Sequence, residues 1–127
     1  MKLKIALAFA ALVVAPSIAL ADGDAAKGKK VFNKCKACHF VDKEKNKVGP
    51  YLKGVIGRKA GSVEGFKYSK AMKAKGEEGL VWTEETIAEY LKAPKKYVPK
   101  NKMAFAGLKK DEDIANVLAY IKEMSAK

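Results

Sequence analysis

The clearest periodic pattern in the sequence lies near its C-terminal end. Apolar residues recur there at i, i+3, i+4 and i+7, which places them on one face of a helix. They are Ile114, Val117, Leu118 and Ile121. Asp111 can cap this helix, and the acidic residues at the next two positions complement the positive end of its dipole. Tyr120 borders the apolar stripe, so we expect a C-terminal helix that packs through this face.

A first helix is predicted over residues 25–36, with Asp22 or Asp24 as its cap. Gly28 lies in its interior, where glycine costs about 1 kcal/mol relative to alanine. An interior glycine of this kind is typical of a helix that another segment approaches closely. The sequence therefore predicts a contact at Gly28, and Tyr120 is a candidate to make it.

Two further helices are predicted over residues 69–75 and 83–93, and the second ends because Pro94 follows. No convincing strand and no internal repeat is visible. The stretches 40–66 and 95–110 contain Gly, Pro, Lys and Asn without a sustained period. Loops of this length are uncommon in a compact domain, and a few short helices bury little apolar area. The pattern therefore predicts a helical domain that is ordered around a bound cofactor.

Residues 1–21 have the pattern of a secretory signal peptide. Lys2 and Lys4 form a short positive region, an uncharged apolar run follows, and a small-x-small cleavage pattern ends at Ala21. The apolar run is shorter than the ~20 residues of a transmembrane anchor, which makes an anchor the weaker interpretation. We expect cleavage after Ala21, a mature domain of residues 22–127 and, in a bacterium, a periplasmic location.

The composition is that of one basic, folded domain. The 127 residues include 26 Lys and Arg against 14 Asp and Glu, which gives a formal net charge of +12, and 49% of the residues are hydrophobic. The chain has two cysteines and one histidine. These are too few for a scaffold of several disulfides or for a zinc site made only of Cys and His.

All of these soft ligands fall within five consecutive positions, Cys35-Lys36-Ala37-Cys38-His39. This is the C-x-x-C-H pattern of c-type haem attachment. At the end of a helix the two thiols lie about one turn apart, so they can add to the two vinyl groups on one porphyrin edge while the adjacent imidazole reaches the iron. Export agrees with this interpretation, because such attachment occurs outside the cytoplasm. We therefore expect one covalently bound haem c.

Three other interpretations of the motif are weaker. A thioredoxin-like redox pair would need a βαβ pattern around it, and none is visible. A zinc site would need a distant carboxylate or water as its fourth ligand. A structural disulfide between Cys35 and Cys38 would close a very small loop and contribute little stability.

The second axial ligand separates electron carriers from gas binders and peroxidases. Beyond residue 21 the methionines are Met72, Met103 and Met124. Met124 borders the apolar stripe of the last helix and Met72 lies on a short helix among lysines, where methionine is more often packing or surface. Met103 lies in an irregular segment, far enough along the chain to reach the opposite haem face. With His39 it would fill both axial positions and raise the reduction potential.

Several segments of the chain, in the same order, are similar to those of one known family. They are Cys35–His39, Lys47-Val48-Gly49-Pro50, Gly57-Arg58-Lys59-Ala60-Gly61, Gly65-Phe66-Lys67-Tyr68, Trp82-Thr83-Glu84-Glu85-Thr86, Glu89-Tyr90-Leu91, Pro94-Lys95-Lys96-Tyr97 and Lys102-Met103-Ala104-Phe105-Ala106-Gly107. In these segments the chain resembles the class I cytochromes c, close to bacterial cytochrome c2 and the mitochondrial carrier. The resemblance implies an all-α fold in which short helices and long loops wrap around one covalently attached haem.

The resemblance also implies the role of each haem ligand. Cys35 and Cys38 would form the thioethers, and His39 and Met103 would bind the iron. Pro50 resembles the proline whose carbonyl accepts the other N–H of the histidine and so fixes its ring.

Five further residues match positions around the haem. Tyr68 and Trp82 match residues that hydrogen-bond a buried propionate, and Arg58 matches a guanidinium that offsets its charge. Tyr90 matches a hydroxyl near the methionine sulfur, and Phe105 matches an aromatic side chain at the exposed haem edge.

The chain departs from the family pattern at three places. Met72 stands where many relatives have asparagine. Lys100-Asn101 replaces the commoner Gly-Thr, so a hydrogen bond to a propionate must come from Asn101 or be lost. Residues 76–81 are longer than the corresponding mitochondrial segment. These departures bear on tuning rather than on function.

By resemblance the protein is a one-electron carrier and not an enzyme, because both axial ligands stay bound and no substrate is transformed. It would take electrons from a cytochrome bc1-type complex and pass them to a photosynthetic reaction centre or to a terminal oxidase or reductase. The sequence leaves the acceptor open between photosynthesis and respiration. A haem enzyme or sensor is the alternative, and it would require that Met103 can be displaced.

The positive charge predicts the partners by sign. By resemblance, lysines ring the exposed haem edge, and they are Lys34, Lys47, Lys95, Lys96, Lys102, Lys109 and Lys110. Such a ring favours acidic faces of membrane-bound redox complexes, with fast and salt-sensitive association. Lysines dispersed along an exported chain argue against nucleic-acid binding. We expect a monomer, and transient association with a membrane surface is compatible with this charge.

Overall fold

The computed structural model describes residues 22–127, and the predicted signal peptide lies outside the described residues. The helical elements, in chain order, are α1 (Ala25–Val31), the 3-10 turn η1 (Phe32–Lys34), α2 (Lys70–Glu77), α3 (Glu84–Lys92), α4 (Pro94–Tyr97) and α5 (Asp111–Ser125). Residues 22–127 contain no β-strand, and their one extended pairing is an isolated antiparallel bridge between Lys59 and Val81. The all-α prediction is confirmed. Within this part of the chain, no helix has the length and apolar character needed to cross a membrane.

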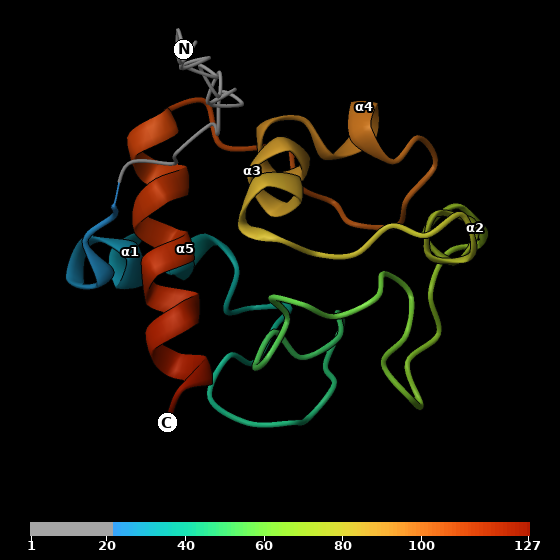
Figure 1. Ribbon diagram of the computed structural model, residues 1–127, viewed down its shortest axis with the longest axis horizontal. Helices are drawn as coiled ribbons and strands as arrows, with labels where there is room; N and C mark the ends of the chain where they lie inside the picture. Colours follow the sequence, from blue (N-terminus) through green and yellow to red (C-terminus); the bar gives the residue numbers. More distant parts are fainter. Residues whose placement is uncertain (1–21) are drawn as a thin grey trace, which may run out of the picture.

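The C-terminal helix α5 packs against α1 and forms one side of the core (Figure 1). The apolar stripe that the sequence predicts is buried along its full length: Ile114, Val117, Leu118 and Ile121 are each at most 4% exposed. The ring of Phe32 packs on Tyr120 with their centroids 5.4 Å apart. Within residues 22–127, α1 and α5 form the most extensive contact between two helices, and burial of this stripe stabilises it.

Gly28 is the point at which α1 and α5 approach most tightly. A Cβ atom at this position would overlap the carbonyl oxygen of Asn116 and would lie 2.9 Å from the Cβ of Tyr120. The close approach predicted for Gly28, with Tyr120 as a neighbour, is therefore confirmed. The glycine offsets its low helix propensity by letting two helix backbones touch.

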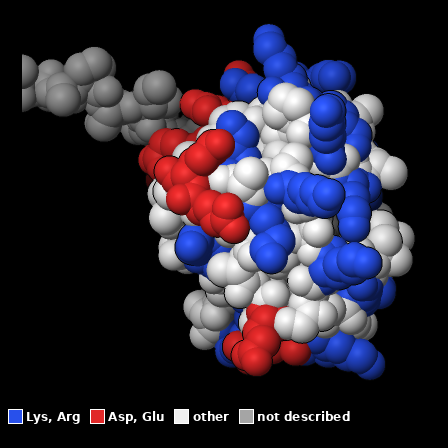
Figure 2. All heavy atoms as spheres, turned by 90° about the vertical axis from the view of Figure 1, so that its right-hand side faces the viewer, with Lys and Arg blue, Asp and Glu red and all other residues white. Residues whose placement is uncertain are grey.

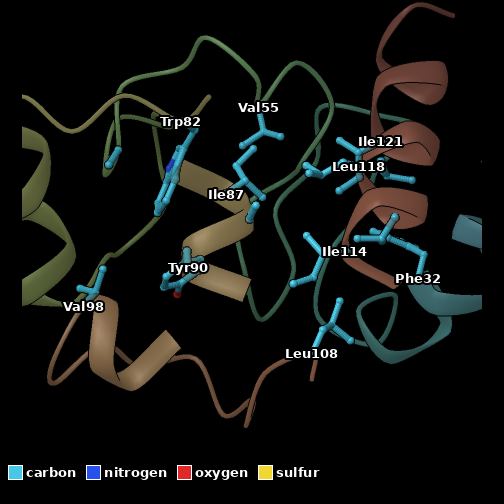
Figure 3. Close-up of a cluster of buried hydrophobic side chains, with 14 residues drawn as sticks. Phe32, Val55, Trp82, Ile87, Tyr90, Val98, Leu108, Ile114, Leu118 and Ile121 are labelled. Carbon is cyan, nitrogen blue, oxygen red and sulfur yellow. The ribbon is translucent and has the colours of Figure 1, made fainter. Parts of the chain in front are cut away.

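The other side of the core is built on α3. Figure 3 shows Ile87 and Tyr90 on α3 beside Val55 and Trp82, across from the side chains of α5. The rings of Trp82 and Tyr90 lie 5.1 Å apart at an angle of 43°. Two apolar walls therefore face each other, and the functional site lies between them.

Polar side chains begin three of the helices. Asp24 accepts a hydrogen bond from the backbone N–H of Lys27 at 3.1 Å, which selects it over Asp22 as the cap of α1. Ser69 caps α2, and Thr83 forms a reciprocal capping box with Thr86 at the start of α3. These caps explain why short helices persist between long loops.

Two predicted helix boundaries were wrong, and the predicted end before Pro94 is confirmed. The first helix does not run to residue 36: the α-helix ends at Val31 and the chain tightens into η1. Asp111 does not cap α5, because it lies inside the first turn, and its carboxylate pairs with Lys92 at 3.1 Å instead. Pro94 ends α3 but also begins α4, since its fixed φ suits the first position of a helix.

The remaining chain is irregular, as predicted for residues 40–66 and, beyond α4, for residues 98–110. These loops run between α5 on one side and α2 on the other (Figure 1). They are tied to distant elements by backbone hydrogen bonds, for example from Leu108 N–H to the carbonyl of Leu91 at 2.7 Å. These bonds satisfy part of the loop backbone without a sheet.

Candidate functional site

A cavity of about 560 Å³ lies between α3, α5 and the long loops. This volume lies within the range of cofactor pockets. The side chains around it include all the residues that the sequence predicts as ligands, Cys35, Cys38, His39 and Met103, together with Met72. Residues far apart in the sequence therefore meet at one site.

The C-x-x-C-H segment reaches the cavity because the chain keeps turning after η1. The backbone N–H groups of Cys38 and His39 both donate to the carbonyl of Cys35, at 3.1 and 3.0 Å. In such a turn, positions i, i+3 and i+4 lie on the same side. The two thiols and the imidazole are consequently presented to the cavity together.

The imidazole of His39 is held in one orientation. Its Nδ1 donates to the carbonyl of Pro50 at 2.7 Å, which leaves the lone pair of Nε2 free to bind a metal. Burial lowers the pKa of His39, partly opposed by this hydrogen bond, so the ring is in the neutral form that ligates. Gly49 packs against the ring, and a Cβ there would overlap Cε1 of His39.

The environment of the Cys35 thiol argues against a redox-active cysteine pair. Burial raises the pKa of Cys35 to about 11, although Lys34 partly offsets the shift. Redox-active cysteine pairs use a thiol of lowered pKa, and Cys35 has the opposite. Among residues 22–127, no group of three or more His, Cys, Asp and Glu side chains is arranged so that it could hold a metal ion.

Met103 receives a polar contact within the cavity. The hydroxyl of Tyr90 donates to its sulfur at an O–S distance of 3.8 Å. Burial raises the pKa of Tyr90 to about 12, so the hydroxyl keeps its proton and remains a donor. The rings of Trp82 and Tyr97 flank Tyr90, at centroid distances of 5.1 and 6.1 Å.

Five residues that the resemblance places around the haem also line the cavity: Arg58, Tyr68, Trp82, Tyr90 and Phe105. The guanidinium of Arg58 donates to the carbonyls of Tyr51 and Lys53, both at 2.7 Å, and is thereby fixed at the cavity wall. The hydroxyl of Tyr68 accepts the N–H of Val63 at 3.0 Å, so its own proton is free for another partner. A positive group and a hydroxyl donor at one wall fit the carboxylates of a haem.

Residues 25–125 match the family model described as cytochrome c. The chain belongs to the cytochrome c family. Cytochrome c2 of Afifella marina is 59% identical over 98 residues, covering 76% of this chain and 79% of that protein. Cytochrome c2 of Blastochloris viridis is 45% identical and covers 94% of both chains. The solved structure of cytochrome cH from Methylobacterium extorquens has a TM-score of 0.72 and 45% identity, and it covers 80% of this chain and 99% of its own.

Membership of the cytochrome c family has two direct consequences. It implies a covalently bound haem c, and the thiols, imidazole and apolar walls of the cavity fit that group. It also makes the chain an electron carrier rather than an enzyme, as the sequence predicts.

For two residues of this cytochrome site, the structure supplies surroundings that the sequence left open. Met72 lines the cavity, whereas its neighbours in the sequence indicated either packing or a surface position. The signal that could have placed it is the helix cap: Ser69 accepts the N–H of Met72, which fixes where α2 begins and which side faces inward. Asn101 is buried, at 5% exposure, and both of its amide N–H bonds go to backbone carbonyls. Both donors of the Asn101 amide are therefore engaged, which favours the alternative in which the hydrogen bond to a propionate is lost.

Proposed function

We propose that residues 22–127 form a soluble periplasmic one-electron carrier with a single haem c. Cys35 and Cys38 would provide the thioethers, and His39 and Met103 would be the axial ligands. The observation that carries the proposal is that these side chains line one cavity, with the imidazole fixed by Pro50.

The bound haem supplies a metal centre that can take up and release one electron. The chain provides the surroundings. The hydrogen bond from His39 to Pro50 keeps the ring in one tautomer, and the apolar walls exclude water from the site. His39 and Met103 would together leave no ligand position open to a substrate, which is the chemical basis of a carrier.

Met103 is favoured over Met72 as the axial thioether. Both line the cavity, but within residues 22–127 only the sulfur of Met103 accepts a side-chain hydrogen bond, which comes from Tyr90. This contact orients the sulfur from α3. Burial does not separate the two residues, because both side chains are partly buried and pack against the apolar core.

Export is supported from two sides. The pattern of residues 1–21 is that of a signal peptide cleaved after Ala21. The match to cytochrome c2 of Blastochloris viridis covers so much of this chain that it extends into these residues. Removal of Lys2 and Lys4 with the leader would lower the formal net charge from +12 to +10.

The surface favours acidic redox partners. Figure 2 shows basic side chains over much of one face, with acidic side chains confined to smaller groups. Lys34 and Lys102 are exposed and also line the cavity, so positive charge lies close to the site of electron transfer. The ion pairs within residues 22–127 involve lysines that do not belong to the predicted ring, so none of them neutralises a lysine of the ring. We infer docking to acidic faces of a bc1-type donor and of a reaction centre or terminal oxidase.

The proposal is tested on protein expressed from the full chain with its leader and purified from the periplasm. We expect an intact mass of residues 22–127 plus one haem. The spectrum should show c-type bands and, in the ferric form, the weak far-red band of methionine ligation. Bound haem without that band would contradict methionine ligation and favour a haem enzyme or sensor. Exported protein without haem would refute the proposal altogether.

Association with the donor complex should weaken steeply as salt rises. Charge steering raises association rates by about tenfold or more, and this gain is lost when ions screen it. We expect Lys102→Glu to slow reduction by a purified bc1-type complex several-fold at low salt. Lys29→Glu makes the same charge change at an exposed position that does not line the cavity, and it should have a smaller effect. A flat salt profile, or equal effects of the two variants, would contradict steering.

A further inference from the structure

One buried side chain holds the segment that carries Met103. Asn101 is 5% exposed, and its Oδ1 accepts the backbone N–H of Met103 at 2.8 Å. Its Nδ2 donates to the carbonyls of Pro94 and Val98, each at 2.8 Å. The amide thereby joins the Met103 segment to the beginning of α4 and to the residue that follows it.

The side-chain amide of Asn101 forms all of its hydrogen bonds with backbone groups. An asparagine side chain has two N–H donors and an oxygen acceptor, and all three serve backbone partners here. The main chain of Asn101 is fixed as well: its N–H donates to the carbonyl of Val98 at 3.2 Å, and its carbonyl accepts the ammonium of Lys95. A shorter hydroxyl side chain could make only part of this set.

The backbone of the preceding residue, Lys100, shows why the hydrogen bonds of Asn101 are needed. Lys100 has a φ of +66°, and it is the one non-glycine residue in the range 22–127 with a positive φ. This backbone conformation is unfavourable for a side chain with a Cβ, and it persists only where surrounding contacts impose it. The contacts of Asn101 lie immediately after the strained position and hold the chain in place.

We propose that Asn101 is a positioning residue, which keeps Met103 at the iron by fixing the backbone of its segment against α4. This inference rests on the proposed ligation by Met103. Asn101 acts on the main chain, whereas Tyr90 acts on the sulfur from α3. Loss of the amide should therefore leave a methionine that still binds but is displaced more easily by another ligand.

The test is the binding of imidazole to the ferric holoprotein, because imidazole reaches the iron only when methionine leaves it. Asn101→Ala removes three hydrogen bonds, and we expect its apparent imidazole affinity to rise about tenfold or more. Asn101→Thr keeps an acceptor for the N–H of Met103 but cannot supply two donors, so it should lie between Asn101→Ala and the unmodified protein. Loss of the far-red band reports the displacement directly.

Asn116→Ala is the matched control. Asn116 is 6% exposed, and its Oδ1 accepts the N–H of Asp24 at 2.8 Å, so the substitution also removes a buried amide that binds backbone. It lies in α5 and does not line the cavity. Its imidazole affinity should stay within about twofold of the unmodified protein, although its stability falls.

Each outcome decides the inference. If Asn101→Ala and Asn116→Ala raise the apparent imidazole affinity equally, Asn101 has only a general stabilising role and the proposal fails. An unchanged imidazole affinity in Asn101→Ala would also overturn the proposal. If Asn101→Ala yields no holoprotein, the comparison of Asn101→Thr with Asn116→Ala decides in the same way. A missing far-red band in the unmodified protein instead refutes ligation by Met103, and the inference falls with it.

Discussion

Replacing Met103 by alanine is expected to abolish the far-red band of the ferric protein and to lower its reduction potential by on the order of 0.1 V or more. The thioether is a soft ligand that favours ferrous iron, and water or a nitrogen ligand in its place favours the ferric state. The variant should also bind imidazole without having to displace a protein ligand. Visible spectra and a potentiometric titration of the holoprotein measure these effects.

Met72→Ala is the control that this cavity provides. Met72 lines the same cavity as Met103, so its removal changes a similar apolar volume at the same site. We expect the far-red band to survive in Met72→Ala, with a much smaller change in potential, since its sulfur lacks the hydrogen bond that Tyr90 gives to Met103. Loss of the band in Met72→Ala, and its survival in Met103→Ala, would assign the ligand to Met72.

The parts of the site that are local in the sequence could be predicted from it. Cys35, Cys38 and His39 are presented together because the spacing of one turn does so, and hydrogen bonds within that turn complete the arrangement. The contact from His39 to Pro50 came from the family resemblance, and the structure contains it. Short-range geometry and a known pattern were sufficient here.

What could not be predicted depends on contacts between distant segments or on the exact ends of helices. The local pattern around Met72 did not place it at the cavity, because the loops that flank α2 bring this helix there. Asn101 gains its partners because α4 exists, and α4 was hidden by the expectation that Pro94 only ends a helix. The hydrogen bonds of Asn101 therefore depend on where α4 begins, and sequence patterns leave that boundary undetermined.

The core showed the same division. The apolar stripe of α5 is periodic, so the sequence predicts it, and an interior glycine predicts that some backbone comes close to α1. The depth of that approach, in which the backbone of Asn116 occupies the space that a Cβ of Gly28 would need, is visible only in three dimensions.

Gly28→Ala is expected to destabilise the holoprotein by about 3 kcal/mol or more, as measured by denaturant unfolding. Helix propensity alone would make alanine about 1 kcal/mol more favourable than glycine. The new methyl group, however, would overlap a backbone carbonyl of α5, which cannot move aside as the end of a flexible side chain can. The steric cost should therefore outweigh the gain in propensity and reverse the sign of the effect.

The variant Ala26→Gly, on the same helix, measures the effect of helix propensity apart from the steric effect of a new methyl group. Ala26 is exposed in α1, so this variant changes backbone propensity without changing a packed contact, and it should cost about 1 kcal/mol. A Gly28→Ala variant as stable as the unmodified protein, or more stable, would mean that α1 and α5 do not meet at this distance. Because α5 carries Val117 and Ile121 into the cavity wall, separating the helices should also loosen the haem site and weaken the far-red band as denaturant rises.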